Sequence, residues 1–129
     1  MRLALAAIVS AATTLGFGAS TPAQAGILKL ILHEDAGFEG GYRILDALDP
    51  EHPDLAWFSD KTSSIVNNDW SAWVLYDDKN YQDRRYCIRS GETVPNLSSP
   101  QWKFNDKISS ARRLNTRSCA GYPTFYTTS

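Results

Sequence analysis

Two short loops of this chain carry oxygen-bearing side chains in the same order. The first is Ser59-Asp60-Lys61-Thr62-Ser63-Ser64, and the second is Asn105-Asp106-Lys107-Ile108-Ser109-Ser110. Ca²⁺ takes about six to eight oxygen ligands from carboxylates, amides, carbonyls and similar groups. Aspartate, asparagine, serine and the backbone carbonyls of a turn supply such ligands. The duplicated loops therefore indicate calcium binding. Because serine hydroxyls are weak ligands, the calcium affinity of such sites should not be among the highest.

The same residues have a second interpretation that needs no metal. Aspartate and serine side chains form local hydrogen bonds to nearby backbone groups, and such bonds can stabilise the corner of a β-structure. The sequence leaves both interpretations open for each loop.

Enzymatic chemistry has weaker support. The two histidines, His33 and His52, lie in neither a Gly-x-Ser-x-Gly nor a His-Glu-x-x-His pattern. The acidic pairs at 34–35 and 77–78 could be compared with the two carboxylates of a glycosidase. They occupy equivalent positions in two turns, however, which favours a turn or ligand role. We therefore expect a protein that is not an enzyme.

The loops belong to a longer repeat. An aliphatic run, an acidic pair and an aromatic residue precede each loop, at 32–40 and at 75–83. Self-similarity of this kind indicates a duplicated supersecondary unit. Runs rich in β-branched and aromatic residues predict short strands, at 28–32, 42–45, 65–66, 73–76, 85–88 and 111–114. The segments 49–54 and 94–100 are predicted loops with room for one helical turn. Two equivalent halves of short strands predict an all-β Greek-key sandwich.

Two motifs of the repeat resemble those of the βγ-crystallin superfamily, in particular its secreted microbial, calcium-binding members. One motif is aromatic, four residues, aromatic, one residue, glycine; it is matched at 33–40 and 76–83. Each copy has one departure: His33 replaces the first aromatic residue, and Asp83 replaces the glycine, whose position requires positive φ. The other motif is Asn/Asp, Asn/Asp, two free positions, Ser/Thr, Ser. The loop at 105–110 matches it fully, and the loop at 59–64 differs only at its first position.

The resemblance implies two calcium sites, each shared between the repeats. The serine at the fifth loop position would supply its hydroxyl, the third position its backbone carbonyl, the partner repeat an acidic side chain, and the hairpin a carbonyl. These residues are Ser63 and Ser109, Lys61 and Lys107, Asp60 or Asn105 with Asp106, and Glu34 and Asp77. The sequence does not decide which of Asn105 and Asp106 ligates.

The resemblance also implies one domain. We expect a single βγ-crystallin-like sandwich over residues 26–129, with Greek-key motifs at about 28–67 and 72–114 and a tail at 115–129. Residues 1–25 have the layout of a secretory signal peptide, in which Arg2 precedes a run of apolar and small residues that ends in Ala23-Gln24-Ala25. We therefore expect a secreted protein.

The two cysteines, Cys87 and Cys119, form an even and isolated pair. In an oxidising compartment such a pair most simply forms one disulfide, which would tie the tail to the second repeat. The spacing fits neither a Cys-x-x-Cys redox pair nor a zinc site.

The charge balance of 13 basic and 14 acidic residues gives no electrostatic basis for nucleic-acid binding. We expect calcium ions as partners, no membrane contact after signal cleavage, and a monomer. Two alternatives remain. Secreted bacterial metalloprotease inhibitors and a killer-toxin-like protein resemble this chain in fold and loops, which makes an extracellular protease a candidate partner, although those inhibitors typically carry two disulfides. A cell-wall or glycan-binding module could use Trp57, Trp70, Trp73 and Trp102; for Trp57 and Trp102 we expect packing in the core or loops.

Overall fold

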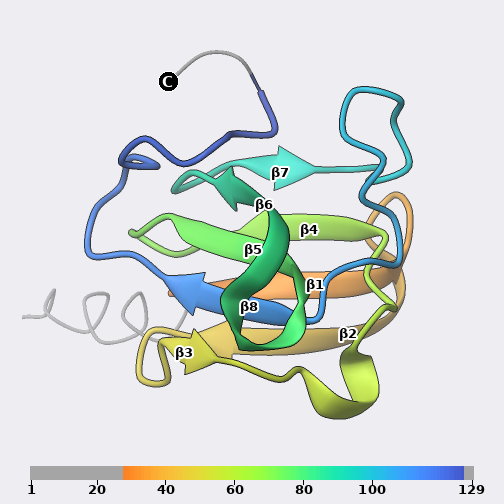
Figure 1. Cartoon of the computed structure of the whole chain (residues 1–129), viewed down its shortest axis with the longest axis horizontal. Helices are drawn as coiled ribbons and strands as arrows, with labels where there is room; N and C mark the ends of the chain where they lie inside the picture. The colour runs from red at the N-terminus through yellow and green to blue at the C-terminus, as the bar shows by residue number, and fades with distance from the viewer. Residues whose placement is uncertain (1–27, 127–129) are drawn as a thin grey trace, which may run out of the picture.

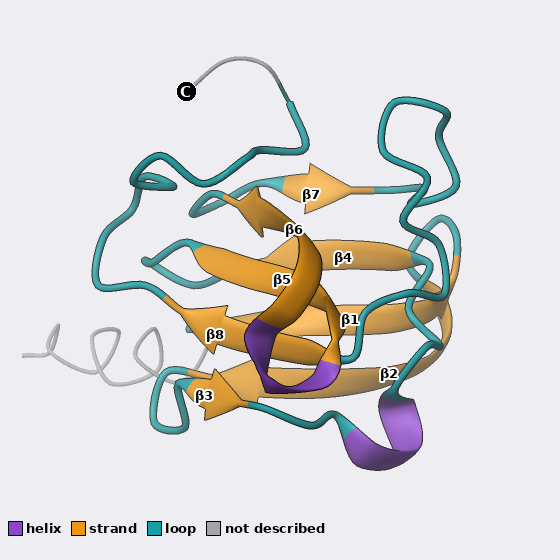
Figure 2. Ribbon diagram, viewed as in Figure 1, coloured by secondary structure: helices purple, strands orange, loops and turns teal. Residues whose placement is uncertain are grey.

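The computed structural model describes residues 28–126, so the predicted signal peptide lies outside the described residues. Eight strands and two short 3₁₀ helices occupy this range (Figures 1 and 2). They are β1 (Lys29–Asp35), β2 (Glu39–Asp46), β3 (Glu51–His52), η3 (Ala56–Phe58), β4 (Ser64–Asn67), β5 (Trp73–Asp78), η4 (Lys79–Tyr81), β6 (Gln82–Ile88), β7 (Thr93–Val94) and β8 (Ser110–Arg113). Within this range, no helix is both long and apolar enough to span a bilayer.

The strands form two four-stranded antiparallel sheets that pack face to face (Figure 1). The first sheet has the order β2-β1-β4-β7, and the second has the order β3-β8-β5-β6. Each sheet includes the third strand of the other repeat: β7 of the second repeat joins the first sheet, and β3 of the first repeat joins the second sheet. This exchange gives the two repeats a shared core, as expected for halves that cannot bury an apolar face alone.

The exchanged strands β3 and β7 correct the sequence-based assignment. β3 lies inside the predicted loop at 49–54, whereas β7 overlaps the predicted loop at 94–100 only at Val94, so residues 95–100 form a loop as predicted; neither segment holds a helical turn. Each strand is two residues long. A strand of two residues is too short to show a repeated alternation of polar and apolar side chains, so periodicity could not reveal these strands. The other six strands form where their residues predicted them, with longer bounds at the hairpins.

The core lies between the sheets and follows from the alternation along each strand. Leu30 and Leu32 of β1 are fully buried, and so are Trp73 and Leu75 at the corresponding places of β5. Phe125 of the C-terminal tail enters the same core and stacks on Tyr86, with ring centroids 5.0 Å apart. The tail therefore belongs to the domain.

A buried ion pair connects the end of the second repeat to the segment between the repeats. Asp69 accepts hydrogen bonds from Arg113 Nε at 2.6 Å and Nη2 at 2.9 Å, and from Trp73 Nε1 at 2.8 Å. Burial alone raises the pKa of Asp69, but the hydrogen bonds from Arg113, Trp73 and the Ser71 amide together outweigh burial and lower it. Asp69 therefore stays ionised within the fold.

Candidate metal centre

The two loops at 59–64 and 105–110, here called the acidic-serine loops, are joined by backbone hydrogen bonds. Asp60 N donates to Ile108 O at 3.0 Å, and Asp106 N donates to Thr62 O at 2.9 Å. Both aspartates have left-handed backbone, with φ of 62° at Asp60 and 54° at Asp106. Aspartate tolerates this region better than most residues because its short polar side chain bonds locally. The loops are thereby held side by side in a reciprocal arrangement.

The reciprocal arrangement brings a serine of each loop to the aspartate of the other. Ser63 Oγ lies 3.4 Å from Asp106 Oδ1, and Ser109 Oγ lies 3.0 Å from Asp60 Oδ1. Ser109 Oγ is also 3.5 Å from Lys107 O. The serines are nearly buried, whereas both aspartates are exposed. Two oxygen clusters result, and each draws side chains from both repeats.

Asn105 and Asp106, between which the sequence could not choose, differ in their side-chain contacts. Asp106 contacts Ser63, and no side-chain hydrogen bond of Asn105 is found among the described residues. Lys61 and Lys107 are exposed, so their ammonium groups can remain in solvent while their carbonyls stay in the loops.

The hairpins place further carbonyls beside the clusters. Ser63 N donates to His33 O at 2.8 Å, and Ser109 N donates to Tyr76 O at 2.9 Å. Glu34 and Asp77, whose carbonyls the resemblance predicted as ligands, are the next residues along their strands. The Asp77 carboxylate lies 3.4 Å from Arg84 Nη2, so that side chain already has a partner.

The sixth loop position was missed as a functional position by sequence reasoning. Ser64 Oγ donates to Asp35 O at 2.6 Å and accepts from Phe38 N at 3.0 Å. Ser110 repeats the arrangement, donating to Asp78 O at 2.6 Å and accepting from Tyr81 N at 3.1 Å. The two hydrogen bonds of each serine therefore connect its hairpin to its loop. The available signal was the recurrence of the same residue at the same place in both repeats.

The two departures from the hairpin motif are accommodated locally. His33 lies at the hairpin corner, with its ring centroid 6.0 Å from those of Phe38 and Tyr42, and burial lowers its pKa. Asp83 has φ of 68°, close to the 76° of Gly40 at the equivalent position. A carboxylate oxygen of Asp83 lies within 4.8 Å of those of Asp77 and Asp78, so the residue that replaces glycine adds a third carboxylate to this cluster.

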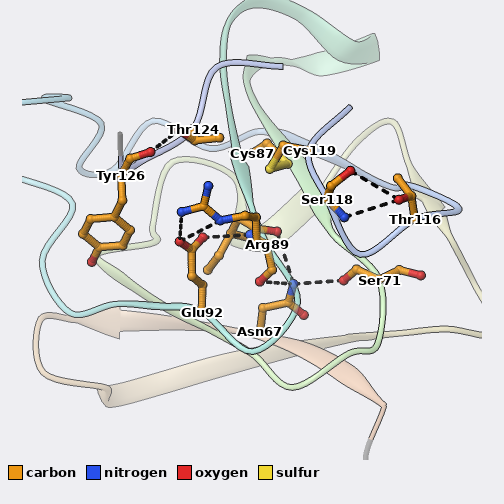
Figure 3. The surroundings of a disulfide bond; sticks show 11 residues. Asn67, Ser71, Cys87, Arg89, Glu92, Thr116, Ser118, Cys119, Thr124 and Tyr126 are labelled. Atoms are coloured by element: carbon orange, nitrogen blue, oxygen red, sulfur yellow. Dashed lines mark hydrogen bonds and ion pairs between the residues drawn. A yellow bond between two sulfur atoms is a disulfide. The ribbon is translucent and has the colours of Figure 1, made fainter. Parts of the chain in front are cut away.

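The disulfide joins Cys87 of β6 to Cys119 of the tail, as the isolated pair predicted (Figure 3). Their Cα atoms are 5.9 Å apart. Next to the bridge, Cys87 N donates to Pro123 O at 2.7 Å. Arg89, directly after the end of β6, forms an ion pair with Glu92 at 2.6 Å, also visible in Figure 3. The tail is thus fixed to the edge of the second sheet by covalent and hydrogen bonds.

The tryptophans differ in their exposure. Trp73 and Trp102 are buried, and Trp102 packs against Phe125. Trp57 is 64% exposed and Trp70 is 50% exposed. The expectation of core packing is therefore right for Trp102, whereas Trp57 stays outside the core and its ring packs edge-on against that of Phe58, with centroids 5.2 Å apart.

Fold and loops together define a domain built from two exchanged Greek-key motifs. A family model described as Beta/Gamma crystallin matches residues 29–114. The chain belongs to the β/γ crystallin family.

Relatives and solved structures agree with this family. Gamma-crystallin B of Bos taurus is 34% identical over 87 residues, which are 67% of this chain and 46% of the relative. The chain thus spans about half the length of the curated relatives it matches. A beta gamma crystallin from Ciona intestinalis is 28% identical with a TM-score of 0.57, covering 67% of this chain and 99% of that one. A betagamma-crystallin from an archaeon shares the fold at 23% identity and a TM-score of 0.55, covering 67% and 96%.

Proposed function

We propose that this chain is a secreted, non-enzymatic β/γ crystallin domain that binds Ca²⁺ at two sites between its repeats, and that the ions stabilise the fold. The observation that carries the proposal is the reciprocal pairing of Ser63 with Asp106 and of Ser109 with Asp60. A single loop with a local turn would need no oxygen atom from the other repeat.

The chemistry of the donor set fits calcium. Each cluster combines a hydroxyl with an anionic carboxylate, and loop and hairpin carbonyls lie close by. These are hard oxygen ligands of the kind that Ca²⁺ prefers. Neither cluster contains a sulfur or imidazole ligand, which a site for softer metals such as zinc generally uses.

The arrangement also explains how ions would stabilise the protein. A ligand that binds the folded state alone adds RT ln(1 + [L]/Kd) to the free energy of unfolding. Because Asp60 and Asp106 come from different repeats, both sites exist only when the loops lie side by side. Bound ions would therefore hold the repeats together.

The test is isothermal calcium titration of four variants. Ser63→Ala and Asp106→Asn should weaken the same site, and Ser109→Ala and Asp60→Asn should weaken the other. A chain with one variant from each pair should lose both sites, whereas a chain with both variants of one pair should keep one. Asp49→Asn is the matched control, because it removes an exposed carboxylate outside the loops. Unchanged stoichiometry and affinity in all variants would contradict the proposal and leave the serines a role in the turns alone.

A further inference from the structure

The outer face of the first sheet presents apolar side chains to solvent. This face is formed by the outward residues of β1 and β2, whose neighbours Leu30, Leu32 and Leu45 point into the core. Its members are Lys29, Ile31 and His33 on β1 and Tyr42, Ile44 and Asp46 on β2. Tyr42 is 59% exposed and Ile44 is 42% exposed. Exposed apolar side chains gathered on one sheet face mark an interaction surface more often than scattered ones do.

The outer face of the second sheet is covered by the chain itself. Val74 and Cys87 occupy its centre, and both are fully buried. Cys119 and Tyr122 of the tail pack against them, together with Leu114. The repeat relates Val74 and Cys87 to Ile31 and Ile44 of the first sheet. Corresponding apolar pairs therefore have different surroundings: the tail covers Val74 and Cys87, whereas Ile44 is exposed and Ile31 is half-buried.

The cross-strand pairs of the open face make it complementary to itself. Across β1 and β2, Lys29 lies opposite Asp46, Ile31 opposite Ile44, and His33 opposite Tyr42. A two-fold axis between these strands and parallel to them would place β1 of one copy over β2 of another. Each side chain would then face its own cross-strand partner type: lysine would face aspartate, isoleucine would face isoleucine, and histidine would face tyrosine. A two-fold interface requires this kind of self-complementarity.

We propose that the outer face of the first sheet is a homodimer interface, in which a second copy of this chain packs β1 over β2 and β2 over β1. The isoleucines form its apolar centre, and the Lys29 and Asp46 charges fix its register at one end. The proposal differs from the monomer expected from the sequence, which could not show which sheet face the tail leaves open. The proposal does not depend on calcium binding.

The test is sedimentation velocity over a range of protein concentrations, with the disulfide intact. Wild type should associate reversibly to a dimer. Ile44→Lys should abolish the dimer while the thermal melt stays cooperative, since Ile44 is partly solvated in the single chain. Leu48→Lys is the matched control, because Leu48 is 94% exposed in the turn that leads to the second sheet. A wild type that stays monomeric at millimolar concentration, or a dimer that Ile44→Lys leaves intact, would overturn the proposal.

Charge reversal tests the register. Lys29→Glu should weaken the dimer about tenfold, because each ion-pair contact is made twice and becomes repulsive. Adding Asp46→Lys should restore the affinity, since glutamate would then face lysine in both contacts. A double variant as weak as the single one would overturn the register. Comparing the full-length chain with one that starts at Gly26 is a further control: a dimer formed only by the full-length chain would assign association to residues 1–25 and overturn the proposed interface.

Discussion

Removal of the disulfide should lower the stability by an amount that the loop length sets. Replacing both Cys87 and Cys119 with alanine opens a loop with a sequence separation of 32 residues. On the chain-entropy model this loop corresponds to about 3.7 kcal/mol at 25 °C. For a domain of this size, the melting temperature should fall by about 15–30 °C. The variant should still fold, because Phe125 keeps the tail in the core and packs on Tyr86.

Urea denaturation of the oxidised wild type and the double alanine variant gives this difference directly. The slope m should also rise in the variant, because an unfolded chain without the cross-link exposes more surface. Wild type that has been reduced and alkylated is the control for the substitutions themselves. A difference in unfolding free energy below about 1 kcal/mol, with equal slopes, would refute the loop-entropy reasoning.

Four further substitutions probe three polar side chains of the fold. Asp69→Ala should cost about 3–5 kcal/mol in urea denaturation, because it leaves Arg113 buried without its partner. Since the folded pKa of Asp69 is lowered, its stabilisation is present above the ordinary carboxyl pKa and is lost as pH falls through the folded value, so Asp69→Asn should flatten the acid limb of a stability–pH curve. The lowered pKa of His33 means that the unfolded chain takes up the proton first, so stability should fall as pH drops below about 6.5, and His33→Phe should remove that slope. Ser110→Ala should cost about 1–3 kcal/mol, measured by thermal melting, because it removes two partly buried hydrogen bonds, to the Asp78 carbonyl and from the Tyr81 amide, each with a net value of about 0.5–1.5 kcal/mol.

Much of the fold could be predicted because it depends on local patterns. The alternation of Leu30 and Leu32 with outward residues predicts β1, and the same holds for β5. The exchange of β3 and β7 could not be predicted from their residues, because two-residue strands are held by backbone pairing with the other repeat. Backbone hydrogen bonds place little constraint on residue type, so the sequence does not reveal them.

The candidate site shows a similar division. Residue types predict oxygen ligands in both loops, and family resemblance predicts that the sites are shared between repeats. That Asp106, and not Asn105, meets Ser63 depends on the left-handed turn at Asp106, which only the folded loop shows. The hairpin role of Ser64 likewise depends on how the hairpin folds back over its loop. The exposed ring of Trp57 reflects the direction of η3, which the sequence does not define.

The central claim, that calcium stabilises the fold through the loops, is tested most directly by unfolding free energies in calcium and in chelator. Wild type and a Ser63→Ala/Ser109→Ala variant should be compared by urea denaturation under both conditions. At a hundredfold excess of calcium over Kd, each site should add about 2.7 kcal/mol to wild type. The variant, which lacks both hydroxyls, should gain much less while keeping nearly wild-type stability in chelator. Equal unfolding free energies of wild type in calcium and in chelator would contradict the account.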